Sequence, residues 1–293
     1  MKISLFFKKI FTLSLLLIFC ALIGKGWYIA RDGLIVRRII GWEDQSLELG
    51  WNEEAKSAMK QRFYNLGRGR QSYAFLSEDG RYVIKIPRYG RFRLPLWLQA
   101  MNLKCLESYR KHRIVKKQAA KEVLLQSFQI AFDSLKEESA IIAVRFPGEK
   151  GNGEVIKIAD RLGRHYDLPL NTTGFVLQHK KVLFNEVFEK ILLMKDREKI
   201  AHRFDQLLEV VATRARKGIT CRDDAFMYNF GFDEFQAYQI DVGDFRRPIT
   251  GNPKEIFDQS VQGSLKPIRA WIKKIDSDLL YLLDQKVEKL TYD

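Results

Sequence analysis

The glycine-rich run Leu66-Gly67-Arg68-Gly69-Arg70-Gln71-Ser72 precedes the apolar run Tyr82-Val83-Ile84-Lys85-Ile86. Residues 73–76 and 82–86 have strand composition, and Ser77-Glu78-Asp79-Gly80 between them predicts a hairpin turn. Glycines let the backbone approach an anion closely, so that its N–H groups can donate to it. A lysine in the middle of an apolar strand is costly to bury unless an anion meets it. The stretch therefore predicts a hairpin that offers glycine backbone and Lys85 to a phosphate.

Each half of this stretch has a simpler alternative. The glycines fit an ordinary turn before a strand, and Lys85 fits an edge strand that points its side chain into water. The glycine pattern is no Rossmann fingerprint, because no helix follows it, and no Walker loop, because Gly-Lys-Ser/Thr is absent.

Polar residues farther along the chain extend the pattern. Glu122 lies on a helix expected over residues 114–135 and is the preferred partner of Lys85, with Glu107 as its rival. A helix expected over residues 197–217 ends at Gly218 and is followed by Asp224 and, five residues on, Asn229. At this spacing the carboxylate could accept the proton of an acceptor hydroxyl, and the amide oxygen could bind a magnesium ion.

The last residue of the series is Asp241, in Ile240-Asp241-Val242-Gly243. It follows a short strand expected at residues 238–240 and precedes a glycine, where a carboxylate could bind Mg²⁺ beside phosphates. The alternative for each of these aspartates is a turn or capping residue. Asp223 also competes with Asp224, although its fifth neighbour is Tyr228, a poor magnesium ligand.

Together these motifs resemble the protein-kinase-like superfamily, over roughly residues 66–243. The resemblance implies that Gly67, Gly69 and Ser72 bind ATP, and that Lys85 contacts its phosphates while paired with Glu122. It implies further that Asp224 is the catalytic base, and that Asn229 and Asp241 hold Mg²⁺. The cofactors expected on this basis are ATP and Mg²⁺.

The sequence departs from the family pattern in several places. Cys221-Arg222-Asp223-Asp224 stands where the family has His-Arg-Asp, Val242 replaces the usual phenylalanine, and Ala-Pro-Glu is absent. The segment after Gly243 is short for a lobe that docks peptides. The chain is therefore nearer to the compact branch that phosphorylates small molecules, sugars or lipopolysaccharide. The alternatives are a pseudokinase and a basic membrane-surface protein that binds no nucleotide.

The amino terminus predicts a membrane anchor. Residues 10–24 are uncharged and are flanked by lysines. Fifteen helical residues span about 22 Å, less than the hydrocarbon core of about 30 Å, but Trp27, Tyr28 and the lysines could extend the span. A cleaved signal peptide is the alternative, although no Ala-x-Ala site follows. Because ATP is cytoplasmic, we expect a single-pass protein with its catalytic domain in the cytoplasm.

The charge of the chain limits its partners. The 293 residues carry a net charge of +14, which favours acidic partners. Residues 88–121 are rich in Lys and Arg, with Phe92, Trp97 and Leu98 among them, and predict contact with an anionic membrane surface. A solvated basic face is the alternative. We do not expect nucleic-acid binding, because the aromatics are grouped with aliphatics. The three cysteines lack metal-site spacing.

We therefore expect an α+β chain, with a two-lobed kinase-like fold after an N-terminal transmembrane helix. Residues 1–38 form the anchor or signal segment and residues 39–62 the juxtamembrane linker. Residues 63–180 form the strand-rich lobe, with a basic insertion at 88–113, and residues 181–293 form a compact helical lobe. Pro267 is expected in the first turn of a C-terminal helix. The acceptor is a hydroxyl on a glycolipid, a sugar or a protein.

Overall fold

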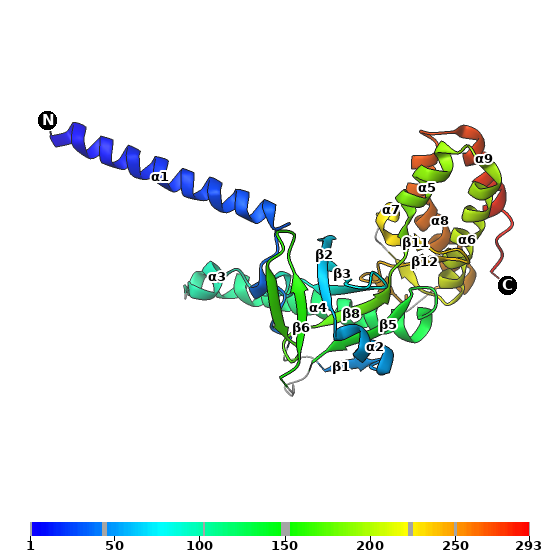
Figure 1. Cartoon of the computed structure of the whole chain (residues 1–293), viewed down its shortest axis with the longest axis horizontal. Coiled ribbons are helices and arrows are strands. Elements are labelled where there is room, and N and C mark those ends of the chain that lie inside the picture. Colours follow the sequence, from blue (N-terminus) through cyan, green and yellow to red (C-terminus); the bar gives the residue numbers. More distant parts are fainter. Residues whose placement is uncertain are drawn as a thin grey trace.

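The computed structural model describes residues 2–42, 46–101, 103–147, 153–221, 225–248 and 251–292, with side chains from Phe7 onward. It is a mixed α+β structure with a curled sheet, a helical part beside it and an apolar N-terminal helix that projects away from both (Figure 1). The expected α+β class is confirmed.

The sheet has eight strands in the order β1-β5-β8-β4-β3-β2-β6-β7. All neighbouring strands are antiparallel except β2 and β6. The bounds are β1 Leu47–Leu49, β2 Arg62–Arg68, β3 Ser72–Ser77, β4 Tyr82–Pro87, β5 Ile141–Phe146, β6 Val155–Ala159, β7 His165–Pro169 and β8 Phe175–His179. The predicted hairpin is confirmed as β3 and β4. Strand β2, which includes Gly67, and strand β7 were not expected from the sequence.

The apolar helix α1 runs over Lys2–Ala30, and its segment Phe7–Ala30 is long and apolar enough to cross a bilayer. These 24 residues measure about 36 Å at 1.5 Å per residue, which exceeds the hydrocarbon thickness of about 30 Å. The segment is not buried against the rest of the protein. The helix therefore extends beyond the expected run of residues 10–24, and it is a candidate membrane span by length and composition.

The end of α1 is fastened to the sheet. The Arg31 guanidinium contacts Asp160 at 3.0 Å, and its Nη2 donates to the Tyr166 hydroxyl at 2.6 Å. The Arg68 Nη1 donates to the Tyr28 hydroxyl at 2.9 Å. Because these contacts join α1 to β2 and to the β6–β7 hairpin, the direction of α1 is set relative to the sheet.

Helix α4 runs over Glu107–Leu135 and covers one side of the sheet. Its buried residues Leu124, Phe128 and Ala131 pack with Val144 and Phe146 of β5. The helix begins seven residues before the expected position 114. Glu107 favours the earlier start, because it lies in the first turn and pairs with Lys111 at 2.8 Å.

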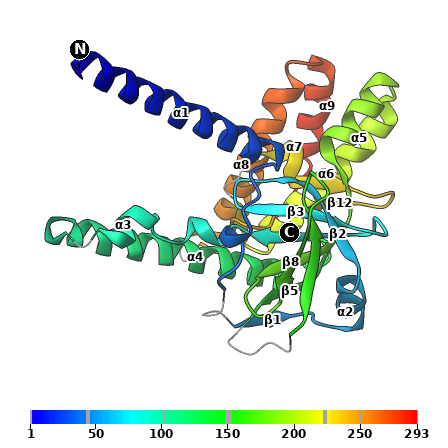
Figure 2. The ribbon, with the colours of Figure 1, turned by 60° about the vertical axis from the view of Figure 1, so that its left-hand side comes forward.

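The basic stretch 88–121 is mostly helical. It contains a 3-10 turn at Tyr89–Arg91, the helix α3 at Leu96–Ala100, a second 3-10 turn at Lys104–Leu106 and the first half of α4. The α3 end of this arm extends away from the body on the side toward which α1 also points, in both Figure 1 and Figure 2.

The helical part has its own apolar core, built around Phe184, Phe188 and Phe204. Its helices are α5 Phe184–Leu193, α6 Arg197–Arg216, α7 Phe226–Asn229, α8 Pro253–Ile272 and α9 Ser277–Val287. Its short strands are β9 Val182–Leu183, β10 Thr220–Cys221, β11 Phe230–Phe232, β12 Ala237–Gln239 and β13 Phe245–Arg246. The helix expected over residues 197–217 is confirmed as α6, which the Asp196 side chain caps.

The expected place of Pro267 was wrong. Helix α8 starts at Pro253, behind an Asn252 cap, and Pro267 lies inside it. The helix continues through the proline because Leu265, Ile268 and Ile272 are buried in the apolar core. Their burial offsets the cost of the lost backbone hydrogen bond.

Candidate functional site

Lys85 lies at the centre of the sheet. Its strand β4 pairs with β3 on one side and β8 on the other, so the edge-strand alternative is excluded. The Lys85 Nζ donates to the Ile240 carbonyl oxygen at 2.6 Å. Burial lowers the pKa of Lys85, and the negative charge of Asp241 opposes this shift. The sheet therefore presents a partly buried lysine to the segment that contains Asp241.

Asn229 and Asp241 are neighbours in the structure. The Asn229 carbonyl oxygen accepts hydrogen bonds from the backbone N–H groups of Ile240, at 2.8 Å, and Asp241, at 3.3 Å. The Asn229 side chain is buried, and the Asp241 Oδ1 accepts from the Gly243 N–H at 3.2 Å. These main-chain hydrogen bonds join Asn229, at the end of α7, to Ile240 and Asp241. Lys85 contacts the same segment through the Ile240 carbonyl.

The glycine-rich turn between β2 and β3 reaches the same segment. The Gly69 N–H donates to the Ser72 carbonyl at 2.8 Å and closes the turn. A Cβ on Gly243 would come within 2.7 Å of the Gln71 Oε1, so the turn touches the residues that follow Asp241. A Cβ on Gly67 would meet no atom within 4 Å. Packing within the protein therefore does not require a glycine at position 67, and space beside its backbone is open.

The two glutamates expected as partners of Lys85 lie elsewhere. Glu122 is exposed on α4, and its carboxylate accepts from the Gln118 side chain at 3.4 Å. Both Lys85 and Glu122 are described, and they form no ion pair with each other in this structure. Glu107 pairs with Lys111 instead. Asp224 and its rival Asp223 lie outside the described residues.

Two buried polar residues at the site were not identified from the sequence. The Ser127 hydroxyl donates to the Val242 carbonyl at 2.6 Å and accepts from the Phe245 N–H at 2.6 Å, which joins α4 to the Asp241 segment. The Gln178 Nε2 donates to the Ile240 carbonyl at 3.1 Å and to the Ser139 carbonyl at 2.8 Å. The signal for Ser127 was a polar residue on the apolar face of its helix.

Gln178 also leaves an acceptor without a partner. Its amide nitrogen faces two carbonyl oxygens, so the amide oxygen points the other way. Within the described part of the chain, no donor contacts this buried Oε1. A donor on a bound ligand would satisfy it.

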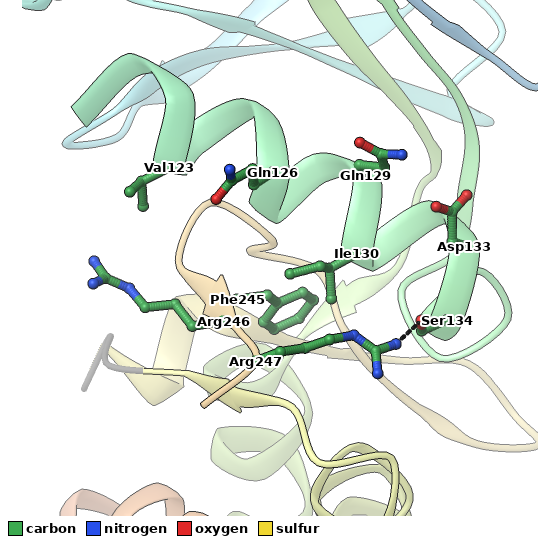
Figure 3. A pocket seen from close by; sticks show the side chains of 9 residues that line it. All are labelled: Val123, Gln126, Gln129, Ile130, Asp133, Ser134, Phe245, Arg246 and Arg247. Atoms are coloured by element: carbon green, nitrogen blue, oxygen red, sulfur yellow. Dashed lines mark hydrogen bonds between the residues drawn. The ribbon is translucent and has the colours of Figure 1, made fainter. Parts of the chain in front are cut away.

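A cavity of about 430 Å³ lies between α4 and β13. Figure 3 shows its lining, with the Arg247 guanidinium donating to the Ser134 hydroxyl at 2.6 Å. The lining residues are Val123, Gln126, Gln129, Ile130, Asp133, Ser134, Phe245, Arg246 and Arg247. None of them is a predicted site residue, and the cavity adjoins the Asp241 segment through Phe245, whose N–H donates to Ser127.

The donor set around Ile240 suits phosphate-bound magnesium. Mg²⁺ binds through one or two protein oxygens together with substrate phosphates and waters, and Asn229 and Asp241 can supply those oxygens. Lys85 and the open glycine backbone are donors for the phosphates. In the part of the chain that the structure describes, no group of three His, Cys, Asp or Glu side chains is placed to hold a metal alone.

Comparisons with known proteins establish no family. The sequence matches no family model and no curated protein. Two structures of WbdD, described as a bifunctional kinase-methyltransferase, resemble it with TM-scores of 0.36 and 0.35 and sequence identities of 18% and 17%. The matches cover 76% and 84% of this chain but only 44% and 47% of the WbdD chains. This chain thus spans less than half of WbdD, and likeness at this level carries no argument about activity.

Proposed function

We propose that this protein is a membrane-anchored, kinase-like phosphotransferase, which moves the γ-phosphate of ATP to a hydroxyl group. The observation that supports this most is the convergence of Lys85, Asn229 and Asp241 on the main chain around Ile240. Lys85 is far in the sequence from Asn229 and Asp241, and the sequence predicts one chemistry for all three. Their meeting beside the glycine-rich turn is what a phosphate site requires.

Each residue has a role in this proposal. Asn229 and Asp241 hold Mg²⁺, which neutralises charge on the phosphates when the nucleotide is bound. Gly67, Gly69 and Ser72 let the backbone come close to the phosphates, and Lys85 donates its N–H groups to them. Asp224 accepts the proton of the attacking hydroxyl. Glu122 pairs with Lys85 in the nucleotide-bound state, after the lysine leaves the Ile240 carbonyl.

The order of elements supports a two-lobed kinase-like fold. Lys85 lies on the third strand of the consecutive β2–β3–β4 meander, and helix α4 follows it, as in protein kinases. In this proposal residues 63–180 form the first lobe. Residues 181–293 form the compact second lobe, and residues 1–38 and 39–62 form the anchor and its linker.

The proposed location follows from α1 and from the need for ATP. Helix α1 anchors the protein as a single span, with the site in the cytoplasm, where ATP is available. The basic arm of residues 88–121 contacts the anionic membrane surface. The acceptor is a hydroxyl-bearing glycolipid, sugar or protein, and nucleic acid is not expected as a partner.

A catalytically inactive nucleotide-binding module is the second candidate. Two observations favour it: Lys85 is hydrogen-bonded to Ile240, and Glu122 points to solvent. Incubation of the full-length protein with Mg²⁺, γ-labelled ATP and membrane lipid, lipopolysaccharide or protein fractions separates the two. Transfer of label that both Lys85→Met and Asp224→Ala abolish supports the phosphotransferase. Nucleotide binding without any transfer supports the inactive module.

A further inference from the structure

Five basic residues gather beside the glycine-rich turn, and the proposed phosphotransfer uses none of them. Arg70 lies in the turn, Arg88 follows β4, Arg91 ends the first 3-10 turn of the arm, and Arg113 and Lys117 lie one turn apart on α4. We refer to these five residues as the basic cluster. Two strand ends and the basic arm thus bring positive charge to one place.

Hydrogen bonds to the main chain hold the basic cluster together. The Arg91 Nη1 donates to the Arg70 carbonyl at 2.6 Å, and the Lys117 Nζ donates to the Arg91 carbonyl. The Arg88 N–H donates to the Gln71 carbonyl at 2.8 Å, and its guanidinium lies over the Tyr73 ring at 5.5 Å. These contacts fix the cations but supply no negative charge.

The basic cluster lacks a counter-ion. All five residues are described, and none forms an ion pair with another described residue, although 14 other pairs occur. Burial and the neighbouring charges of Arg70 and Arg88 lower the pKa of Arg91. Burial, Arg113 and Arg91 lower the pKa of Lys117 in the same way. Like charges held this close are unfavourable unless an anion joins them.

Two donors in the basic cluster are also unsatisfied. The Nε atoms of Arg88 and Arg113 are buried and have no hydrogen-bond partner among the residues that the structure describes. A buried N–H group without a partner costs free energy that a bound acceptor would recover. Arginine side chains present several donors in a fixed fork that matches the oxygens of a phosphate.

The basic cluster lies between the candidate nucleotide site and the end of α1. Its turn touches Gly243 through Gln71, and Arg68 in the same hairpin contacts Tyr28 of α1. A Cβ on Gly90 would lie 3.0 Å from the Arg38 side chain, so the segment after α1 also adjoins it. A membrane that contains α1 would bring its headgroups to this region.

We propose that the basic cluster binds the phosphate group of an anionic lipid at the foot of α1. The proposal rests on the proposed function in taking α1 as a membrane anchor and the basic arm as a contact with anionic lipid, and it names the residues and the chemical group of that contact. It also favours a lipid among the proposed acceptors, because a phosphate-bearing lipid bound here would have its polar part next to the candidate site. The phosphate oxygens of such a headgroup would pair with these cations and accept hydrogen bonds from the two unsatisfied donors.

Native mass spectrometry of the full-length protein in nonionic detergent tests this. The probes are phosphatidic acid and phosphatidylcholine of equal chain length, added without nucleotide. We expect phosphatidic acid to bind in preference to phosphatidylcholine. Arg91→Gln and Lys117→Gln should each weaken its binding about tenfold, since each removes a hydrogen bond to a charged group. Lys116→Gln removes the neighbouring exposed charge and should change binding by less than about twofold.

Three results would overturn the proposal. They are equal binding of the two lipids, undiminished binding of phosphatidic acid in both cluster variants, and displacement of phosphatidic acid by Mg-ADP. The last result would assign the basic cluster to the nucleotide. Thermal unfolding of each variant checks that it is folded. Lys85→Met separates this proposal from the proposed function, because it should remove nucleotide binding and leave lipid binding intact.

Discussion

At the scale of single residues, Lys85 is the most informative position. Its burial lowers its pKa, so over the pH range from its folded pKa to its ordinary value of 10.5 the unfolded chain binds more protons at this site. The free energy of unfolding should therefore rise with pH over that range. Without an anion, a partly buried lysine reduces stability, and the proposed phosphate contact would offset this cost.

The first prediction is that Lys85→Met does not lower the melting temperature of the ligand-free protein and removes its response to Mg-ATP. Methionine fills similar space without a buried charge. The gain in stability between pH 7 and pH 10 should also become smaller. Thermal unfolding across this pH range measures both effects, with the exposed Lys60→Met as the control. Clear destabilisation at pH 7 would contradict this account of Lys85.

The second prediction concerns Asp160, which fastens the end of α1. Burial alone would raise the pKa of Asp160, but the Arg164 N–H, the Arg31 guanidinium and the Tyr166 hydroxyl outweigh it and lower the pKa. The stability it contributes is thus present above its ordinary pKa of about 3.8 and is lost as pH falls below it. Asp160→Asn should lower the free energy of unfolding at pH 7 by about 1–3 kcal/mol.

Denaturant unfolding of the full-length protein in detergent measures this loss at pH 7 and at pH 3. The difference in free energy of unfolding between wild type and Asp160→Asn should be smaller at pH 3 than at pH 7. Asp167→Asn on the adjacent strand β7 is the matched control, because Asp167 is exposed. A difference that does not depend on pH would show that the Asp160 charge is not what fastens α1.

At the scale of elements, short sequence patterns predicted the structures that depend on neighbouring residues. The β3–β4 hairpin and α6 follow from turn residues and from a helix stop, which act within a few positions. The directions of the helical side chains were harder to predict. Glu122 precedes Leu124 and Ser127 on α4, and it is those two residues that face the protein. Which face of α4 packs inward depends on strands that are distant in the sequence, so the expected Lys85–Glu122 contact had no local signal.

The third prediction concerns the α3 end of the arm. Leu96, Trp97, Met101 and Leu103 are exposed there, and the arm extends on the side toward which α1 points (Figures 1 and 2). If α1 crosses a bilayer, these side chains meet its surface. In a chain whose Cys20 and Cys221 are replaced by serine, a fluorophore on the exposed Cys105 should be quenched by spin-labelled lipid when the full-length protein is reconstituted in vesicles.

The matched control places the fluorophore at the exposed Tyr281 of α9, as Tyr281→Cys in a chain whose Cys20, Cys105 and Cys221 are all replaced by serine. Quenching there should be weak, since α9 lies on the opposite side of the molecule (Figure 1). Equal quenching at both sites would show that the arm has no special contact with lipid.

At the scale of the whole molecule, the proposed anchor, phosphate site and lipid site lie on one body. The contacts of Arg31 and Arg68 fix α1 relative to the sheet, and the sheet carries Lys85. The orientation of the anchor therefore decides whether the candidate site meets ATP.

The fourth prediction is that the site faces the cytoplasm. A reporter fused after Asp293 that is active only in the cytoplasm should be active, and one that is active only outside should not be. The opposite pattern would place the site away from ATP and would favour a membrane-surface role without nucleotide.

The most direct test of the central claim is thermal unfolding of the full-length protein with and without Mg-ATP, for wild type, Asp241→Asn and the control Asp244→Asn. Ligand that binds only the folded state raises the melting temperature. We predict a magnesium-dependent rise in wild type and in Asp244→Asn, whose native carboxylate contacts Arg246, and its loss in Asp241→Asn. No rise in folded wild-type protein, or an equal rise in Asp241→Asn, would contradict the assignment of Lys85, Asn229 and Asp241 to a magnesium–nucleotide site.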